Sequence, residues 1–166
     1  MVLLLVVALF ALFTARLFVW PAQDAVAGAH ADAIVVFDGP DARLQVAVRL
    51  ARERAAPVIL LSVSSTRWDC PQWRVPGVRL VCFTPVPATT QGEARFAAAQ
   101  ARANGWQRLI VVSSVPQDTR ARLRLRRCFS GAVEVVTARP SLSEWPGQVL
   151  YEWGALLKAL FLQRGC

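Results

Sequence analysis

The stretch Asp32-Ala33-Ile34-Val35-Val36-Phe37-Asp38-Gly39 decides the fold that this sequence predicts. Five apolar residues run between two aspartates, and the pair Gly39-Pro40 ends the run. A run this short and this rich in branched residues is typical of a strand buried on both faces of a parallel sheet. Because α/β folds place ligands at the carboxyl ends of such strands, Asp38 and Gly39 are the first candidate site residues.

Apolar runs alternate with helical patterns along the rest of the chain. We predict four further strands, at residues 57–63, 78–83, 109–112 and 132–137. We predict helices at residues 41–54, 89–104, 117–129 and 149–163. The segment 117–129 also fits a strand, because its arginines alternate with apolar residues, but the alternation of elements in α/β proteins favours a helix. This order predicts a three-layer, Rossmann-like α/β sandwich over residues 32–166, with a mainly parallel five-stranded sheet.

The two ends of the predicted domain are less regular. Residues 22–31 form a linker of small residues, which also holds His30, the only histidine of the chain. Residues 141–148 are predicted to be a loop. The last helix carries an apolar stripe formed by Leu150, Trp153, Leu157, Leu160 and Phe161.

The N-terminal segment is strongly apolar. Residues 2–20 contain only two polar residues, Thr14 and Arg16. A helix of this length spans about 28 Å, close to the thickness of the hydrocarbon layer. We therefore expect residues 1–21 to be a single-pass transmembrane anchor, and a cleaved signal peptide is the alternative. A positive-inside count on Arg16 alone puts the domain in the cytoplasm, but one arginine is a thin basis. We expect the domain on the extracytoplasmic side of an inner or plasma membrane.

The charge of the chain does not point to a nucleic acid. The formal net charge is +8, from 19 basic and 11 acidic residues, and Lys158 is the only lysine. A basic count dominated by arginine often reflects base composition. We expect a basic domain beside an anionic membrane and no specific nucleic-acid partner.

The four cysteines leave two alternatives open. No CxxC motif occurs, so we expect no metal site. Pairing Cys70 with Cys82 would join the long loop at residues 64–77 to the next strand, and pairing Cys128 with Cys166 would join a helix end to the C-terminus. The alternative is four free, buried thiols in a reducing compartment.

Three predicted turns, at residues 38–43, 87–93 and 113–120, meet at one crevice and open into helices whose N-termini favour anions. Arg43 and Arg120 both lie in first turns, so together they suit a phosphate or a carboxylate, although either alone reads as a solvated surface arginine. Thr90 and Glu93 form the sequence of a capping box, which gives both a structural role that competes with ligand binding. The candidate ligand-binding residues are Asp38, Gly39, Arg43, Thr89, Thr90, Glu93, Ser113, Ser114, Gln117 and Arg120.

The sequence contains few of the motifs that identify a catalysed reaction. No Gly-x-Gly-x-x-Gly, Walker or Gly-x-Ser-x-Gly motif occurs, and the predicted domain has no histidine for a catalytic dyad. General acid–base work would therefore fall to Asp38, Asp41 or Glu93, and Asp38 is the candidate catalytic residue.

Four short motifs lie at defined spacings over residues 32–161. They are Phe37-Asp38-Gly39-Pro40 followed by Arg43, Thr89-Thr90-Gln91-Gly92-Glu93-Ala94, Gly105-Trp106 before the run at 109–114, and Gln117-Asp118-Thr119-Arg120-Ala121. In this spacing the chain resembles the ElyC/SanA/YdcF domain family of bacteria. The resemblance implies a Rossmann-like domain, often behind one N-terminal membrane helix, and a role in envelope biogenesis, peptidoglycan or lipid-carrier metabolism.

The resemblance leaves the ligand open. One branch of the family has been associated with S-adenosylmethionine, so this cofactor or a nucleotide is what the resemblance implies. The chain departs from the family at three places. Its first turn has few glycines, Gly92-Glu93 stands where relatives tend to have Glu-Asn, and Gln117 stands where relatives usually have a histidine. Glutamine can form hydrogen bonds but cannot exchange protons near neutral pH.

Three functions follow as hypotheses. The first is a membrane-anchored domain that binds a small anionic or nucleotide-like ligand and supports cell-envelope biogenesis. The alternative is a hydrolase or transferase acting on a phosphorylated or lipid-linked envelope precursor in the same crevice, with Asp38 as base. The third is a scaffold that docks a partner through the Trp68 and Trp73 loop and the basic segment 122–127.

Overall fold

The computed structural model describes residues 1–22, 24, 30–39, 41–63, 70, 75–141 and 143–166. The elements, in chain order, are α1 (Val2–Phe18), β1 (Ala33–Val36), α2 (Asp41–Arg52), β2 (Val58–Ser62), β3 (Arg79–Phe83), α3 (Thr90–Asn104), β4 (Arg108–Ser114), α4 (Asp118–Cys128), β5 (Ala132–Ala138), α5 (Trp145–Leu157) and the π-helix η1 (Lys158–Leu162). The segment 117–129 is therefore a helix rather than a strand. Most of the predicted loop 64–77, with Trp68 and Trp73, lies outside the described residues.

The five strands form one sheet in the order β3-β2-β1-β4-β5, and every pairing is parallel. The strand predicted from the opening stretch, β1, lies at the centre. Its Ile34 pairs with Ile59 of β2 on one side and with Ile110 of β4 on the other. The predicted α/β fold with a parallel five-stranded sheet is confirmed. The chain reverses its direction of strand addition between β1 and β4, which is where folds of this kind bind ligands.

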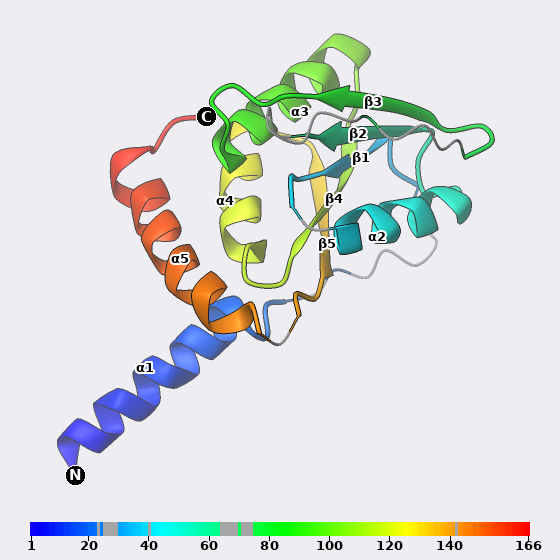
Figure 1. Cartoon of the computed structure of the whole chain (residues 1–166). Helices are drawn as coiled ribbons and strands as arrows, with labels where there is room; N and C mark the ends of the chain where they lie inside the picture. Colours follow the sequence, from blue (N-terminus) through cyan, green and yellow to red (C-terminus); the bar gives the residue numbers. More distant parts are fainter. Residues whose placement is uncertain (23, 25–29, 40, 64–69, 71–74, 142) are drawn as a thin grey trace.

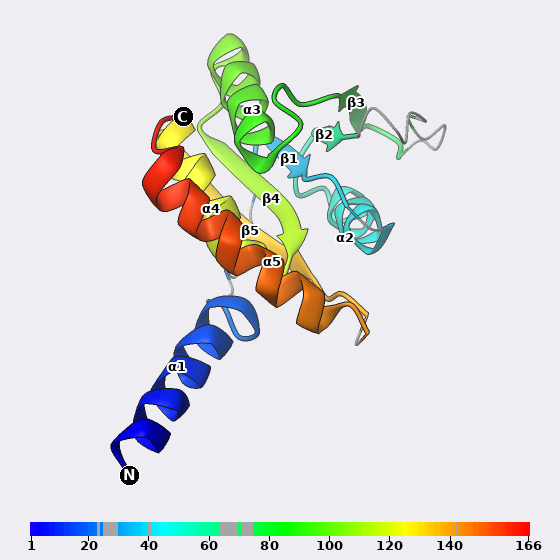
Figure 2. The ribbon, with the colours of Figure 1, turned by 60° about the vertical axis from the view of Figure 1, so that its left-hand side comes forward.

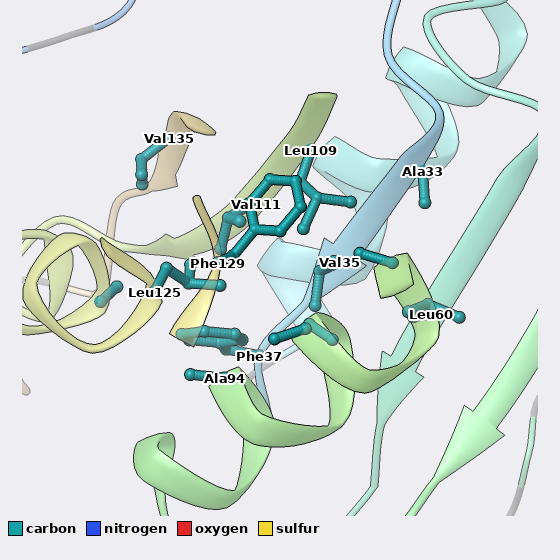
Figure 3. Packing of buried hydrophobic residues seen from close by; sticks show 14 of the residues in the cluster. Ala33, Val35, Phe37, Leu60, Ala94, Leu109, Val111, Leu125, Phe129 and Val135 are labelled. Carbon is teal, nitrogen blue, oxygen red and sulfur yellow. The ribbon is translucent and has the colours of Figure 1, made fainter. Parts of the chain in front are cut away.

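Alternate residues of β1 enter two separate cores. Val35 and Phe37 face α3 and α4, whereas Ile34 and Val36 face α2. Figures 1 and 2 show α2 on one side of the sheet and α3 with α4 on the other. Figure 3 shows part of the core between the sheet and the helices α3 and α4, where Phe37 lies near Ala94 of α3 and Leu125 of α4. Burial on both faces explains why the opening stretch has no polar residue between its aspartates.

Helix α1 extends away from the body of the domain (Figures 1 and 2). It contacts the rest of the chain along its C-terminal half, where Phe10, Phe13 and Phe18 surround Trp153 of α5. The helix is 17 residues long and ends at Phe18, ahead of Pro21, so it is shorter than the predicted segment 2–20. Within the described ranges, no helix combines the length and the apolar character that crossing a membrane requires. The predicted transmembrane helix is therefore not found.

The C-terminal helix differs from the prediction in extent and in orientation. It begins at Trp145, inside the predicted loop, because the Glu144 carboxylate accepts hydrogen bonds from the N–H and the hydroxyl of Ser141, at 3.1 and 2.7 Å, and Pro146 fits a first helical turn. The predicted apolar stripe is mostly exposed. Helix α5 instead packs on α4 through a buried side that includes Glu152 and Leu156.

Disulfides join Cys70 to Cys82 of β3, and Cys128 at the end of α4 to Cys166 at the C-terminus. None of the four cysteines is free. The second disulfide fixes the end of the chain beside α4, next to the residues described below.

Candidate functional site

A pocket of about 370 Å³ lies at the carboxyl ends of β1 and β4, at the reversal of the strand order. Its walls come from the β1–α2 turn, the start of α3, the β4–α4 connection and one side of α5–η1. Eight of the ten predicted ligand-binding residues line it: Asp38, Arg43, Thr89, Thr90, Glu93, Ser114, Gln117 and Arg120. Three separate turns therefore meet at one place, as parallel strands require.

The two remaining predicted residues, Gly39 and Ser113, support the wall from behind. A Cβ atom at Gly39 would lie 2.4 Å from Cζ of Arg43, so only glycine leaves room for this guanidinium. The hydroxyl of Ser113 donates a hydrogen bond to Oε1 of Gln117, at 3.0 Å. Neither residue lines the pocket directly.

Arg43 closes the turn that follows β1. Its Nη1 donates to the carbonyl oxygens of Phe37, at 3.3 Å, and of Asp38. The side chain is buried, and burial lowers the pKa of the guanidinium, whereas the nearby charges of Glu93 and Asp38 act to raise it. Arg43 is thus not a solvated surface arginine. It brings a fixed positive charge to the pocket wall, and its donors at Nη1 are used by the backbone.

Glu93 has a different partner from the one its sequence context predicts. Thr89 is the N-cap of α3, and its hydroxyl accepts from the N–H of Gly92 at 3.4 Å. The cap lies one residue earlier than in the predicted capping box, so that prediction is wrong. Glu93 turns toward the sheet instead and accepts the N–H of Asp38 at 2.5 Å. This bond joins the start of α3 to the end of β1.

Burial raises the pKa of the Glu93 carboxyl group. Its residue is only 3% exposed, and burial raises the pKa from 4.5 to about 6. The Asp38 N–H and the charge of Arg43 oppose this increase in pKa. Such a carboxyl group can take up and release a proton close to physiological pH. Asp38 itself is half-buried and lines the pocket, with its backbone N–H and carbonyl held by Glu93 and Arg43.

Thr90 connects α3 to α4. Its hydroxyl oxygen accepts from Nε2 of Gln117 at 2.9 Å and from Nη1 of Arg120 at 2.5 Å. The oxygen accepts two hydrogen bonds, and the hydroxyl group can still donate its proton to a third group. Gln117 completes the chain of bonds, since it donates to Thr90 and accepts from Ser113. An amide, with a donor and an acceptor, fits this position without exchanging a proton.

Arg120 forms a buried, bidentate ion pair with Glu152 of α5. Its Nε and Nη2 donate to the two carboxylate oxygens, each at 2.7 Å. Burial acts to lower the pKa of Arg120, but the hydrogen bonds and the charge of Glu152 outweigh it, so the pKa is raised. The ring of Tyr151 lies 5.8 Å from its Cζ. The guanidinium that was predicted to bind an external anion therefore holds an internal carboxylate.

The sequence prediction missed the contribution of α5–η1. Polar pocket residues from this side and its neighbours are Gln91, Arg124, Gln148, Tyr151, Glu152, Lys158 and Gln163. One signal was available, because Glu152 is the only acid among residues 145–166 and sits within an apolar pattern. Its partner Arg120 lies 32 residues away, and sequence spacing gives no means of pairing them.

Positive charge predominates in the pocket. Four cations line it, namely Arg43, Arg120, Arg124 and Lys158, against the carboxylates of Asp38, Glu93 and Glu152. Burial lowers the pKa of Arg124, and the neighbouring Arg127 and Arg120 lower it further. Arg124 donates to the carbonyl and to Oε1 of Gln163, at 2.5 and 2.7 Å. Lys158 is exposed, so its ammonium group can meet a ligand directly.

Comparison with known protein families, curated proteins and solved structures finds no match to this chain. The chemical capacity of the pocket therefore rests on its own residues: an excess of positive charge, the hydroxyl group of Thr90 and the buried carboxyl group of Glu93, whose pKa burial raises to about 6.

Proposed function

We propose that this chain is an ElyC/SanA/YdcF-like protein that binds a small anionic or nucleotide-like ligand and supports cell-envelope biogenesis. The observation that carries the proposal is the cationic pocket at the β1–β4 reversal. Its volume, about 370 Å³, falls in the range typical of small-molecule sites. Parallel α/β folds bind their ligands at this edge of the sheet.

The residues divide the work of binding an anion. Arg43 and Arg120 are committed to the backbone and to Glu152, so they contribute a fixed positive field rather than free donors. Direct contacts come from the ammonium group of Lys158 and the hydroxyl proton of Thr90, because both remain available. A phosphate or a carboxylate, including the carboxylate of S-adenosylmethionine, suits this arrangement.

Membrane attachment is the second part of the proposal. Apolar side chains cover α1, and nearly all of them are exposed outside the contact with Trp153. An exposed apolar surface of this size marks an interaction site, and the net charge of +8 favours an anionic membrane. The two disulfides support an oxidising compartment, which agrees with an extracytoplasmic domain and an envelope role.

The alternative is a hydrolase or transferase acting on a phosphorylated or lipid-linked envelope precursor. One observation favours it, namely the pKa of Glu93 near 6 directly behind Asp38. Asp38 would act as the base at the pocket surface. Gln117, which stands where relatives usually have a histidine, would then only position groups. If the purified protein binds its ligand but turns over neither phosphoryl nor methyl-donor substrates, the binding function is favoured.

Ligand-induced thermal stabilisation tests the binding function. The full-length protein in detergent is heated with pyrophosphate, adenosine monophosphate or S-adenosylmethionine, and we expect at least one to raise the unfolding midpoint. A ligand at roughly one hundred times its Kd contributes about 2.7 kcal/mol. Lys158→Gln should reduce the gain, whereas Arg102→Gln, an exposed cation on α3 away from the pocket, should not. No stabilisation by any of the three compounds, or equal losses in both variants, would contradict the proposal.

A further inference from the structure

The last helical segment exposes an apolar face that the fold does not use. Its residues are Leu150, Tyr151, Leu157, Leu160, Phe161 and Leu162, which are between 39% and 80% exposed. Leu150, Leu157 and Phe161 follow one another at helical spacing along a single stripe. The buried side of the same helix carries Glu152 instead. A helix on a water-exposed surface normally buries its apolar side and exposes its charged residues, and here the arrangement is reversed. Such an exposed apolar face marks an interaction site.

This face is continuous with the apolar surface of α1. Trp153 of α5 lies against Phe10, Phe13 and Phe18 of α1, with ring centroids 5.6, 5.9 and 5.2 Å apart. In Figure 1, α5 starts beside the C-terminal end of α1 and then runs across its direction. Phe10 and Phe18 are separated by about 12 Å along the helix axis. Inserting the part of α1 that precedes Phe10 in a bilayer brings Trp153 to the boundary of the hydrocarbon layer, where tryptophan is favoured.

The charges around the face suit a lipid surface. Lys158 lies within the exposed stretch, and Arg164 follows it near the C-terminus. Among residues 145–166 the sole acid is Glu152, which is buried and paired with Arg120. The segment therefore presents apolar and basic groups without an exposed carboxylate side chain. This combination is typical of helices that lie in the interface of an anionic bilayer.

We propose that the exposed face of α5–η1 lies on the surface of the lipid bilayer that α1 enters. The inference rests on the membrane attachment proposed above. Tyr151 and Lys158 belong both to this segment and to the lining of the pocket. Docking of the face therefore holds the pocket mouth at the layer of lipid headgroups. The occupant is lipid rather than a second copy of the chain, because α1 presents its own apolar surface beside the same face.

Quenching by brominated lipids tests the proposal on the full chain. Single cysteines for an environment-sensitive fluorophore are introduced by Leu157→Cys and Phe161→Cys on the face, by Leu4→Cys on α1, and by Arg102→Cys on exposed α3 as the control. Mass analysis confirms that both native disulfides remain. Each labelled protein is reconstituted into vesicles of phosphatidylcholine and phosphatidylglycerol, with and without bromine on the acyl chains. We expect labels at positions 157, 161 and 4 to lose most of their fluorescence in brominated lipid, and the label at 102 to keep it.

The other outcomes separate the two proposals. Quenching at position 4 without quenching at 157 and 161 overturns the interfacial role of α5–η1 and leaves the membrane attachment of α1 standing. Absence of quenching at position 4 overturns both. Labels at 157 and 161 that are shielded from lipid, together with chemical cross-linking of two chains through this face, overturn the proposal in favour of a dimer. Lys158→Glu adds a charge test, because it should weaken quenching at 157 more than at 4.

Discussion

Glu93 links one residue's environment to the pH dependence of the whole domain. Because the folded state raises its pKa from 4.5 to about 6, the folded protein binds more protons than the unfolded chain between these pH values. Its free energy of unfolding therefore falls as the pH rises from 4.5 through 6, by about 2 kcal/mol in total. Glu93→Gln should remove this decrease while its side-chain oxygen still accepts the Asp38 N–H.

Urea unfolding of the detergent-solubilised protein, measured at intervals between pH 4 and pH 7, gives the slope directly. Glu53→Gln, which removes an exposed carboxylate, is the matched control. The difference in slope between the two variants isolates the contribution of Glu93. If the slope is unchanged in Glu93→Gln, burial does not raise the pKa of Glu93 in the folded protein.

A close contact, rather than a need for backbone flexibility, requires glycine at position 92. A Cβ atom at this position would lie 2.0 Å from the carbonyl oxygen of Pro87, which is closer than any side chain tolerates. We expect Gly92→Ala to lower the thermal unfolding midpoint by several degrees, because α3 must shift away from the preceding loop. Gly154→Ala, in the middle of α5 with nothing within 4 Å of the added atom, should instead stabilise by about 0.5–1 kcal/mol. Equal effects of the two substitutions would refute the steric explanation.

The sequence predicted the types of several site residues but not their partners. Arg43 and Arg120 were found because they follow predicted strands in the first turns of helices, a local property. Their bonds to the β1 backbone and to Glu152 depend on how distant elements pack. Glu93 shows the same limit. The N-cap of α3 is Thr89 rather than Thr90, and the hydrogen-bond partner of Glu93 is Asp38, 55 positions earlier.

At the scale of elements, the Arg120–Glu152 pair joins α4 to α5. Glu152→Gln leaves a buried guanidinium without its countercharge, so we expect a loss of about 3–5 kcal/mol in the free energy of unfolding. The double variant Arg120→Met with Glu152→Leu should recover most of this loss, since it removes both charges and keeps the apolar volume. Chemical unfolding of wild type, Arg120→Met, Glu152→Leu and the double variant completes the cycle, with Glu152→Gln measured alongside. A double variant as unstable as Glu152→Gln would mean that the charges themselves, rather than their balance, hold α5 in place.

Strands were easier to predict than the last helix, for a physical reason. Each strand is built on a short apolar run, interrupted only in β5 by Glu134, because a sheet covered on both faces admits few polar residues. Helix α5 was assigned by its apolar stripe, but that stripe is exposed and the buried side includes Glu152. The rule that apolar faces turn inward fails where a helix contacts something other than water or its own core, and the lipid contact proposed for α5–η1 would be such a case.

At the scale of the whole molecule, the sequence predicted the alternation of elements but not the order of the strands. The hydrophobic runs identify β1 to β5 in turn, yet nothing in them states that β4 pairs with β1 rather than with β3. That pairing creates the reversal at which the pocket forms. The extent of the pocket also depends on α5 and the chain end, which the Cys128–Cys166 disulfide fixes beside α4.

The disulfides make the compartment testable. Disulfides persist in oxidising environments, so the extracytoplasmic location proposed above predicts that Cys70–Cys82 and Cys128–Cys166 stay oxidised in the cell. When cells are lysed in denaturant without a reductant, we expect no alkylation of any cysteine. The next steps use intact cells. If the domain is extracytoplasmic, as proposed, treatment with a membrane-impermeant reductant followed by an impermeant maleimide should then label the cysteines. Alkylation without reductant, or labelling only after the membrane is permeabilised, would place the domain in a reducing interior, where the second disulfide could not fix the chain end that closes the pocket.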